Sequence, residues 1–113
     1  MSAQRVAKVE SVIQHATAQS IRDVLEGDAA RVTVTRVDCA PDMRSAIVWI
    51  GLLGTDAQIE TLWERLVGAR HRLQHDLAGK MTTKFVPQLH LRQDTGGAYA
   101  AEIDRLLRAQ PDL

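Results

Sequence analysis

Positively charged side chains gather in one stretch of this 113-residue chain, between Arg65 and Arg92. The stretch contains one acidic residue, Asp76, and its basic residues are Arg65, Arg70, Arg72, Lys80, Lys84 and Arg92. Lysine and arginine neutralise backbone phosphates, so this cluster predicts a nucleic-acid-binding surface. The alternative is a solvated helix face whose countercharges lie elsewhere in the fold, because the whole chain balances 14 basic against 14 acidic residues.

Other residues in the chain could in principle support catalysis or metal binding. His71 and His75 are four residues apart, a spacing that places two imidazoles on one helix face. No convincing third ligand lies near them, so phosphate-facing or exposed histidines are expected instead, and no metal. Cys39 has no histidine close in sequence to act as its base, which favours a buried thiol over a nucleophile. The chain is therefore not expected to be an enzyme or to hold a cofactor.

Composition limits the remaining possibilities. A single cysteine excludes an internal disulfide and multi-cysteine zinc sites, which suits a reducing compartment and favours the cytoplasm. No run approaches the roughly 18 apolar residues that a spanning helix needs, so no membrane association is expected. At 45% hydrophobic residues, the chain is long enough to form one core without disulfides or metals. We expect one domain over residues 4–108, with frayed termini at 1–3 and 109–113.

The first half of the chain predicts a helix followed by a hairpin. Apolar residues recur at three- and four-residue spacing over 4–25, which is typical of an amphipathic helix. Residues 32–37 and 45–50 have the β-branched and aromatic composition of strands, and Pro41-Asp42 between them favours a turn. A hairpin is therefore expected directly after the first helix.

The second half predicts two helical pieces, a strand and a short last helix. Thr55 and Gln58 match a capping box, and the helix that they begin is interrupted at Gly68 before a second piece over 69–78. Residues 84–92 read as a strand, with Pro87 at an edge, a bulge or the strand's start. Residues 98–107 have the pattern of a short C-terminal helix.

The resulting order, α-β-β-α-α-β with a short helix at the end, indicates an α+β fold with helices on one face of a three-stranded sheet. This is the order of a type II KH domain. KH modules normally clamp RNA backbone with a GXXG loop between two helices, whereas this chain has Gly68, Ala69, Arg70 and His71 there. An interrupted or kinked helix is expected in place of that loop.

Several segments together resemble the ribosome-binding factor A family. The hairpin over 34–50 is similar to the family's "ITxVEVSxDLxxAKVYV", with Asp42 and Ala46 in register, and 77–94 is similar to "LGKxMRLRxVPELxFxxD" through Val86-Pro87-x-Leu89. The chain departs from the family where its Ala-x-Gly kink aligns with Ala69-Arg70-His71, and it has fewer cations after Met81. The resemblance covers nearly the whole chain.

The resemblance implies a KH-like protein that binds the free small (30S) ribosomal subunit through its 16S rRNA, near the 5′ terminal helix. It further implies a role in late assembly and rRNA processing, greatest importance during growth at low temperature, a monomer, and other assembly factors such as GTPases as possible partners. The alternative is a KH-like protein-interaction module without direct RNA contact, which the neutral net charge favours.

For an RNA contact, the side chains expected to meet phosphate fall into two groups. The first group is Arg70, Arg72, Lys80, Lys84 and Arg92, and the second is Arg5, Lys8 and Arg31. The amides at the start of the helix near Ala69 could also face a phosphate. Trp63 and Phe85 are expected in the core, while Trp49, late in its strand, is open to either role.

Overall fold

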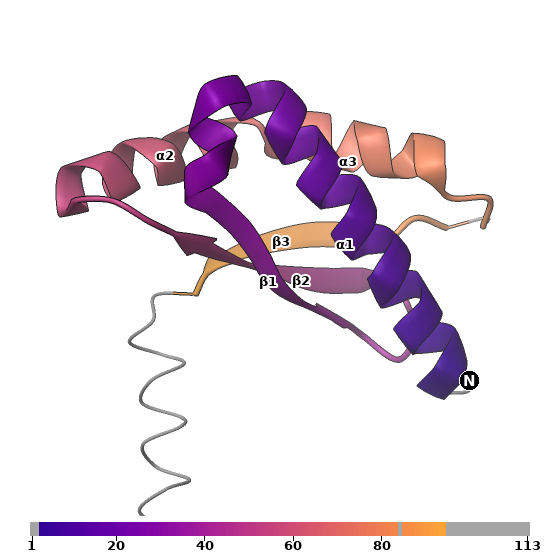
Figure 1. Cartoon of the computed structure of the whole chain (residues 1–113). Helices are drawn as coiled ribbons and strands as arrows, with labels where there is room; N and C mark the ends of the chain where they lie inside the picture. Colours follow the sequence, from indigo (N-terminus) through magenta and orange to yellow (C-terminus); the bar gives the residue numbers. More distant parts are fainter. Residues whose placement is uncertain (1–2, 84, 95–113) are drawn as a thin grey trace, which may run out of the picture.

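The computed structural model describes residues 3–83 and 85–94. Three α-helices lie on one side of a three-stranded sheet (Figure 1). The strand order is β1-β2-β3, with β1 and β2 antiparallel and β2 and β3 parallel. The expected α+β fold is confirmed, and the element order and mixed sheet are consistent with the KH-like type II arrangement. The expected domain start at residue 4 lies in the first turn of the first helix, whereas the expected helix at 98–107 and the expected domain end at 108 lie outside the described residues.

Helix α1 (Ala3–Leu25) follows the predicted periodicity, because its buried residues lie along one stripe. Ile13, Ile21 and Leu25 are almost completely buried against the sheet and α3. The chain continues from α1 into a short 3₁₀ helix, η1 (Glu26–Arg31), which separates α1 from the hairpin. Glu26 adopts a φ of 52°, the left-handed conformation that often ends a helix.

The predicted hairpin consists of β1 (Val32–Cys39) and β2 (Ser45–Leu52). Its turn is closed by the Met43 amide, which donates to the Ala40 carbonyl at 2.8 Å. The Asp42 carboxylate accepts a bond from the Arg44 amide at 3.1 Å, as an aspartate in a turn often does. A register shift between Val34 and Arg36 interrupts the otherwise regular pairing.

The expected interrupted helix is present. Helix α2 (Asp56–Gly68) begins with the predicted capping box. The backbone N–H of Gln58 donates to Thr55 Oγ1 at 3.2 Å, and the backbone N–H of Thr55 donates to Gln58 Oε1 at 2.9 Å. Ala69 separates α2 from α3 (Arg70–Lys80). The Ala69 amide bonds to carbonyls of α2, and its own carbonyl accepts from Leu73 in α3, so the break occupies a single residue.

Strand β3 (Gln88–Gln93) is shorter than expected, since it begins after Pro87 rather than at residue 84. Proline has no amide to donate to a sheet, so the buried Pro87 fits immediately before the strand. The prediction that Phe85 packs in the core is wrong, because its side chain is 71% exposed. Trp63 is half-buried and packs against the core, so the sequence-based expectation is correct for only one of these two aromatics.

The core lies between the helices and one face of the sheet. Alternate residues of the strands are buried on that face, including Val48 and Ile50 of β2 and Leu89 and Leu91 of β3. They pack against α1, α2 and α3. No helix of the described residues covers the opposite face of the sheet (Figure 1). No helix in residues 3–83 and 85–94 is long and apolar enough to cross a membrane.

Candidate nucleic-acid interface

The outer surfaces of α1 and α3 form a shallow groove that contains three of the predicted RNA-binding side chains. A hollow of about 440 Å³ is lined by Lys8 and His15 of α1 and by Lys80 of α3. An adjoining hollow of about 290 Å³ adds Arg72 and shares Lys80. We call these two hollows the α1–α3 groove, and its further polar lining residues are Ser11, Gln19, Ser20, Asp23, His75 and Asp76.

Three cations, Lys8, Arg72 and Lys80, and two carboxylates, Asp23 and Asp76, line the α1–α3 groove, which leaves it an excess of one positive charge. Lys8 and Lys80 are exposed, and neither takes part in an ion pair within the described residues. The third cation, Arg72, donates to Asp76 at 3.1 Å and is therefore partly neutralised. Exposed ammonium groups keep their water until a ligand arrives and can contact phosphate without breaking an internal bond.

Asp76 connects the two helices at the floor of the groove. Its carboxylate accepts a 2.6 Å bond from the buried Ser20 hydroxyl of α1 and a second bond from Arg72. The Ser20 hydroxyl, with Arg72 as a further cause, holds the pKa of the Asp76 carboxyl below its ordinary value. Ser20 thereby fixes the orientation of α3 relative to α1, on which the spacing of the groove's cations depends.

This bond predicts a specific acid sensitivity. A carboxyl whose pKa is lowered by folding stabilises the fold above its unfolded pKa, near pH 4, and that contribution is lost as the pH falls through the lower folded pKa. Ser20→Ala should therefore lower the melting temperature at neutral pH and make the acid decline below about pH 4 shallower. Melting curves across pH measure both effects.

Ser11→Ala is the matched control for this prediction, because Ser11 is an exposed serine on the same helix. It should leave both the melting temperature and its pH dependence unchanged. If the melting temperature of Ser20→Ala falls as steeply below about pH 4 as that of the unmodified protein, the Ser20–Asp76 bond does not cause the acid sensitivity.

The remaining predicted cations lie elsewhere. Arg92 lies on the uncovered face of the sheet, and Arg70 directs its guanidinium to the Leu89 carbonyl of β3 at 3.4 Å. Arg31, the last residue of η1, lines a separate hollow together with residues of α2. Arg5 lies in the first turns of α1 but does not line the groove, and Lys84 is outside the described residues. The stretch that is contiguous in sequence is thus divided among several surfaces.

Arg65 shows why the local charge excess overstates the basic surface. Its guanidinium forms a 2.8 Å ion pair with Asp28 of η1, which is 37 residues away in sequence. The countercharge therefore comes from another part of the fold, as the alternative interpretation of the charge cluster supposed. Of the predicted cations that the structure describes, Lys8, Arg72 and Lys80 share the groove.

Several groove residues were not among the predicted RNA-binding side chains, and His15, Gln19 and Ser20 are examples. A helical-spacing signal was available in the sequence, because Lys8, His15 and Gln19 recur at seven and four residues and so share one face of α1. Ser20 had no such signal. Its partner Asp76 is 56 residues distant and could be assigned only from the tertiary packing.

The helix interruption positions α3 without opening a loop. Gly68, Ala69, Arg70 and His71 form the junction between α2 and α3, and Gln74 of α3 then bonds to β3. Its side-chain amide donates to the Pro87 carbonyl at 2.9 Å and accepts from the Leu89 amide at 2.8 Å. These bonds attach α3 to the edge of the sheet.

Neither a metal nor an activated thiol is indicated in the described part of the chain. His71 and His75 belong to no group of three or more potential ligands among these residues. Burial, followed by the nearby Glu10 and Asp42 carboxylates, raises the pKa of the Cys39 thiol and favours its neutral, weakly nucleophilic form. The site therefore offers cations and hydrogen-bond donors to a ligand.

Fold and groove together define a small α+β domain in which two helices present a basic groove above a mixed three-stranded sheet. The family model for ribosome-binding factor A matches residues 5–107. This chain belongs to the ribosome-binding factor A family.

Individual relatives agree with that assignment. A ribosome-binding factor A from Thermomicrobium roseum is 30% identical over 109 residues, covering 96% of this chain and 84% of the relative. The crystal structure of the Thermus thermophilus protein has a TM-score of 0.66 at 22% identity, covering 78% of this chain and 93% of the other. A Thermus thermophilus homology model fitted into a map of a 30S–ribosome-binding factor A complex has a TM-score of 0.58 at 20% identity, covering 75% and 90%. At these identities the structures support the fold.

Proposed function

We propose that this protein binds the free small ribosomal subunit through its 16S rRNA and assists late assembly and processing of the rRNA 5′ region. Membership of the ribosome-binding factor A family supports the partner. The observation that carries the RNA contact is the pair of uncompensated lysines, Lys8 and Lys80, on opposite walls of the α1–α3 groove. The proposal is for a cytoplasmic protein that acts by binding and not by catalysis, in agreement with the family's name.

The α1–α3 groove supports phosphate recognition rather than base reading. Lys8 and Lys80 supply point charges, while Gln19 and His15 supply hydrogen-bonding groups between them. Phosphate contacts of this kind position a protein on RNA and make its affinity depend on salt. Arg70, Arg92, Arg5 and Arg31 remain proposed contacts outside the groove, and Lys84, which lies outside the described residues, remains a proposed contact as well.

Sedimentation of the tagged full chain from a cell lysate tests this function. We expect co-migration with free small subunits and absence from complete ribosomes, with release from the subunits as salt is raised. Recovery only at the top of the gradient would contradict the proposal. Recovery with subunits that persists unchanged at high salt would favour the alternative, a protein-interaction module.

A further inference from the structure

The face of the sheet opposite the helices carries an ordered aromatic and basic cluster that the α1–α3 groove does not involve. Trp49 of β2 lies opposite Arg36 of β1 on one side and opposite Arg92 of β3 on the other. In the next row, Ile47 lies between Asp38 and His90. No described helix covers these residues (Figure 1).

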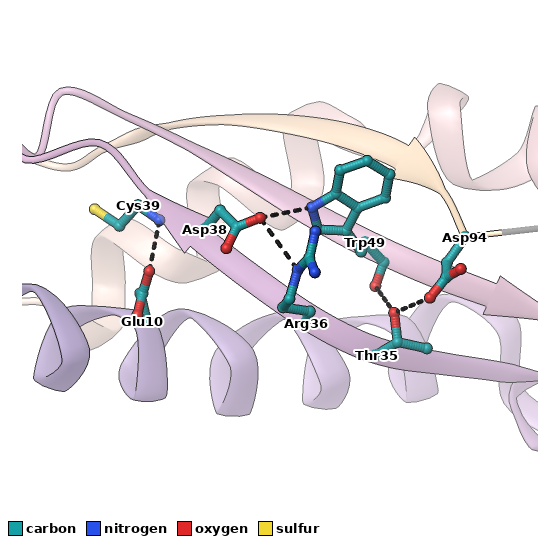
Figure 2. Close-up of polar contacts among 7 residues, drawn as sticks. All are labelled: Glu10, Thr35, Arg36, Asp38, Cys39, Trp49 and Asp94. Atoms are coloured by element: carbon teal, nitrogen blue, oxygen red, sulfur yellow. Dashed lines mark hydrogen bonds and ion pairs between the residues drawn. The ribbon is translucent and has the colours of Figure 1, made fainter. Parts of the chain in front are cut away.

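The Trp49 ring is held in a fixed position. Its Nε1 donates to Asp38 Oδ2 at 2.9 Å, and the same carboxylate oxygen pairs with Arg36 Nε at 3.2 Å (Figure 2). The Arg36 guanidinium carbon lies 5.1 Å from the centre of the ring, within the range of a cation–π contact. Indole, guanidinium and carboxylate thus form one connected unit whose side chains are already ordered.

The acidic groups of this face are already engaged by neighbours. Asp38 accepts from Trp49 and Arg36, and Asp94 accepts a 2.9 Å bond from Thr35 (Figure 2). Arg92 is exposed and belongs to no ion pair within the described residues; its Nη1 donates a long 3.4 Å bond to the Leu91 carbonyl, which leaves its other guanidinium donors for a ligand. The face therefore offers flat π surfaces beside a cation.

We propose that this sheet face binds single-stranded RNA by stacking one base on the Trp49–Arg36 unit while Arg92 contacts the adjoining phosphate. Aromatic rings and guanidinium planes both stack on bases, and every base has a π face. A protein partner fits less well, because Ile47 is the one aliphatic side chain among the six residues of these two rows. The inference rests on the proposed RNA function and adds a second contact face, opposite the groove.

Fluorescence of the full chain with Trp63→Phe, which leaves Trp49 as the only tryptophan, tests the stacking. Titration with a short single-stranded oligoadenylate should quench Trp49 emission to saturation, and inorganic polyphosphate should not. Equal quenching by polyphosphate, or none by oligoadenylate, would overturn the proposal. So would complete protection of Trp49 from acrylamide in the free protein, because another segment or a second copy would then already cover the face.

The fluorescence anisotropy of a labelled oligoadenylate measures the affinity of the unmodified protein and of variants of this face. Trp49→Leu should weaken binding about tenfold and Arg92→Ala by a smaller factor, whereas Trp49→Phe, which keeps a ring, should retain most of the affinity. Unchanged affinity in both Trp49→Leu and Arg92→Ala would overturn the proposal. The α1–α3 groove lies on the other side of the sheet, so replacing Lys8 and Lys80 by alanine should leave the oligoadenylate affinity and the quenching at saturation near those of the unmodified protein, while weakening binding to small-subunit rRNA. If rRNA binding is unchanged as well, the groove proposal fails while the stacking proposal stands.

Discussion

Replacing Lys8 and Lys80 together by alanine should weaken binding to small-subunit rRNA by roughly 10- to 100-fold, since each loses a bond to a charged phosphate. The slope of log affinity against log salt should become shallower by about two, one for each lost phosphate contact. Filter binding or anisotropy across a salt series measures both quantities. The fold should persist, because both side chains are exposed and belong to no ion pair in the described residues.

Arg65→Ala is the control for that double variant. It also removes a cation, but one already paired with Asp28 at 2.8 Å and outside the groove. It should leave both affinity and salt slope near those of the unmodified protein. If Arg65→Ala weakens binding as much as the double variant does, general charge rather than the α1–α3 groove determines the affinity.

Leu77→Ala should cost about 2–5 kcal/mol of unfolding free energy, because a fully buried leucine is replaced by a side chain that leaves a cavity. Alanine is at least as good a helix former as leucine, so the loss would come from packing rather than from helix propensity. Leu77 lies in α3, which packs against α1, so the same change should loosen the α1–α3 groove. Urea denaturation measures the loss.

Leu53→Ala makes the same chemical change at a side chain that is 69% exposed. It should alter the unfolding free energy by no more than about 0.5 kcal/mol. A difference between the two variants smaller than about 1 kcal/mol would mean that the helices and sheet do not form the single tight core described above.

The groove and the open sheet face together explain how a chain without net charge could bind RNA. Lys8 and Lys80 are concentrated on one surface, while Arg65 and Arg36 are compensated by Asp28 and Asp38. Affinity depends on the local field at the contact and not on the sum over the chain. The two candidate surfaces also lie on opposite sides of the sheet, so one domain could contact two RNA segments.

Local patterns in the sequence were sufficient for most of the elements. Helix periodicity predicted α1, the Thr55–Gln58 capping box marked the first residue of α2, and the β-branched runs predicted the hairpin. These signals are carried by residues a few positions apart, which is why they can be recognised without a structure. The family resemblance likewise depended on contiguous segments around Asp42 and Pro87.

Contacts between residues that are distant in sequence could be identified only from the tertiary structure. Asp28 neutralises Arg65, Ser20 holds Asp76, and Arg92 lies beside Trp49 on the face opposite the groove. Phe85, expected in the core, is exposed because it lies before the strand, which begins at Gln88 and not at residue 84. The sequence alone determined which side chains could meet phosphate. Packing of α1 against α3 determined which of them lie together in one groove, because ion pairs and shared surfaces depend on distance in space rather than along the chain.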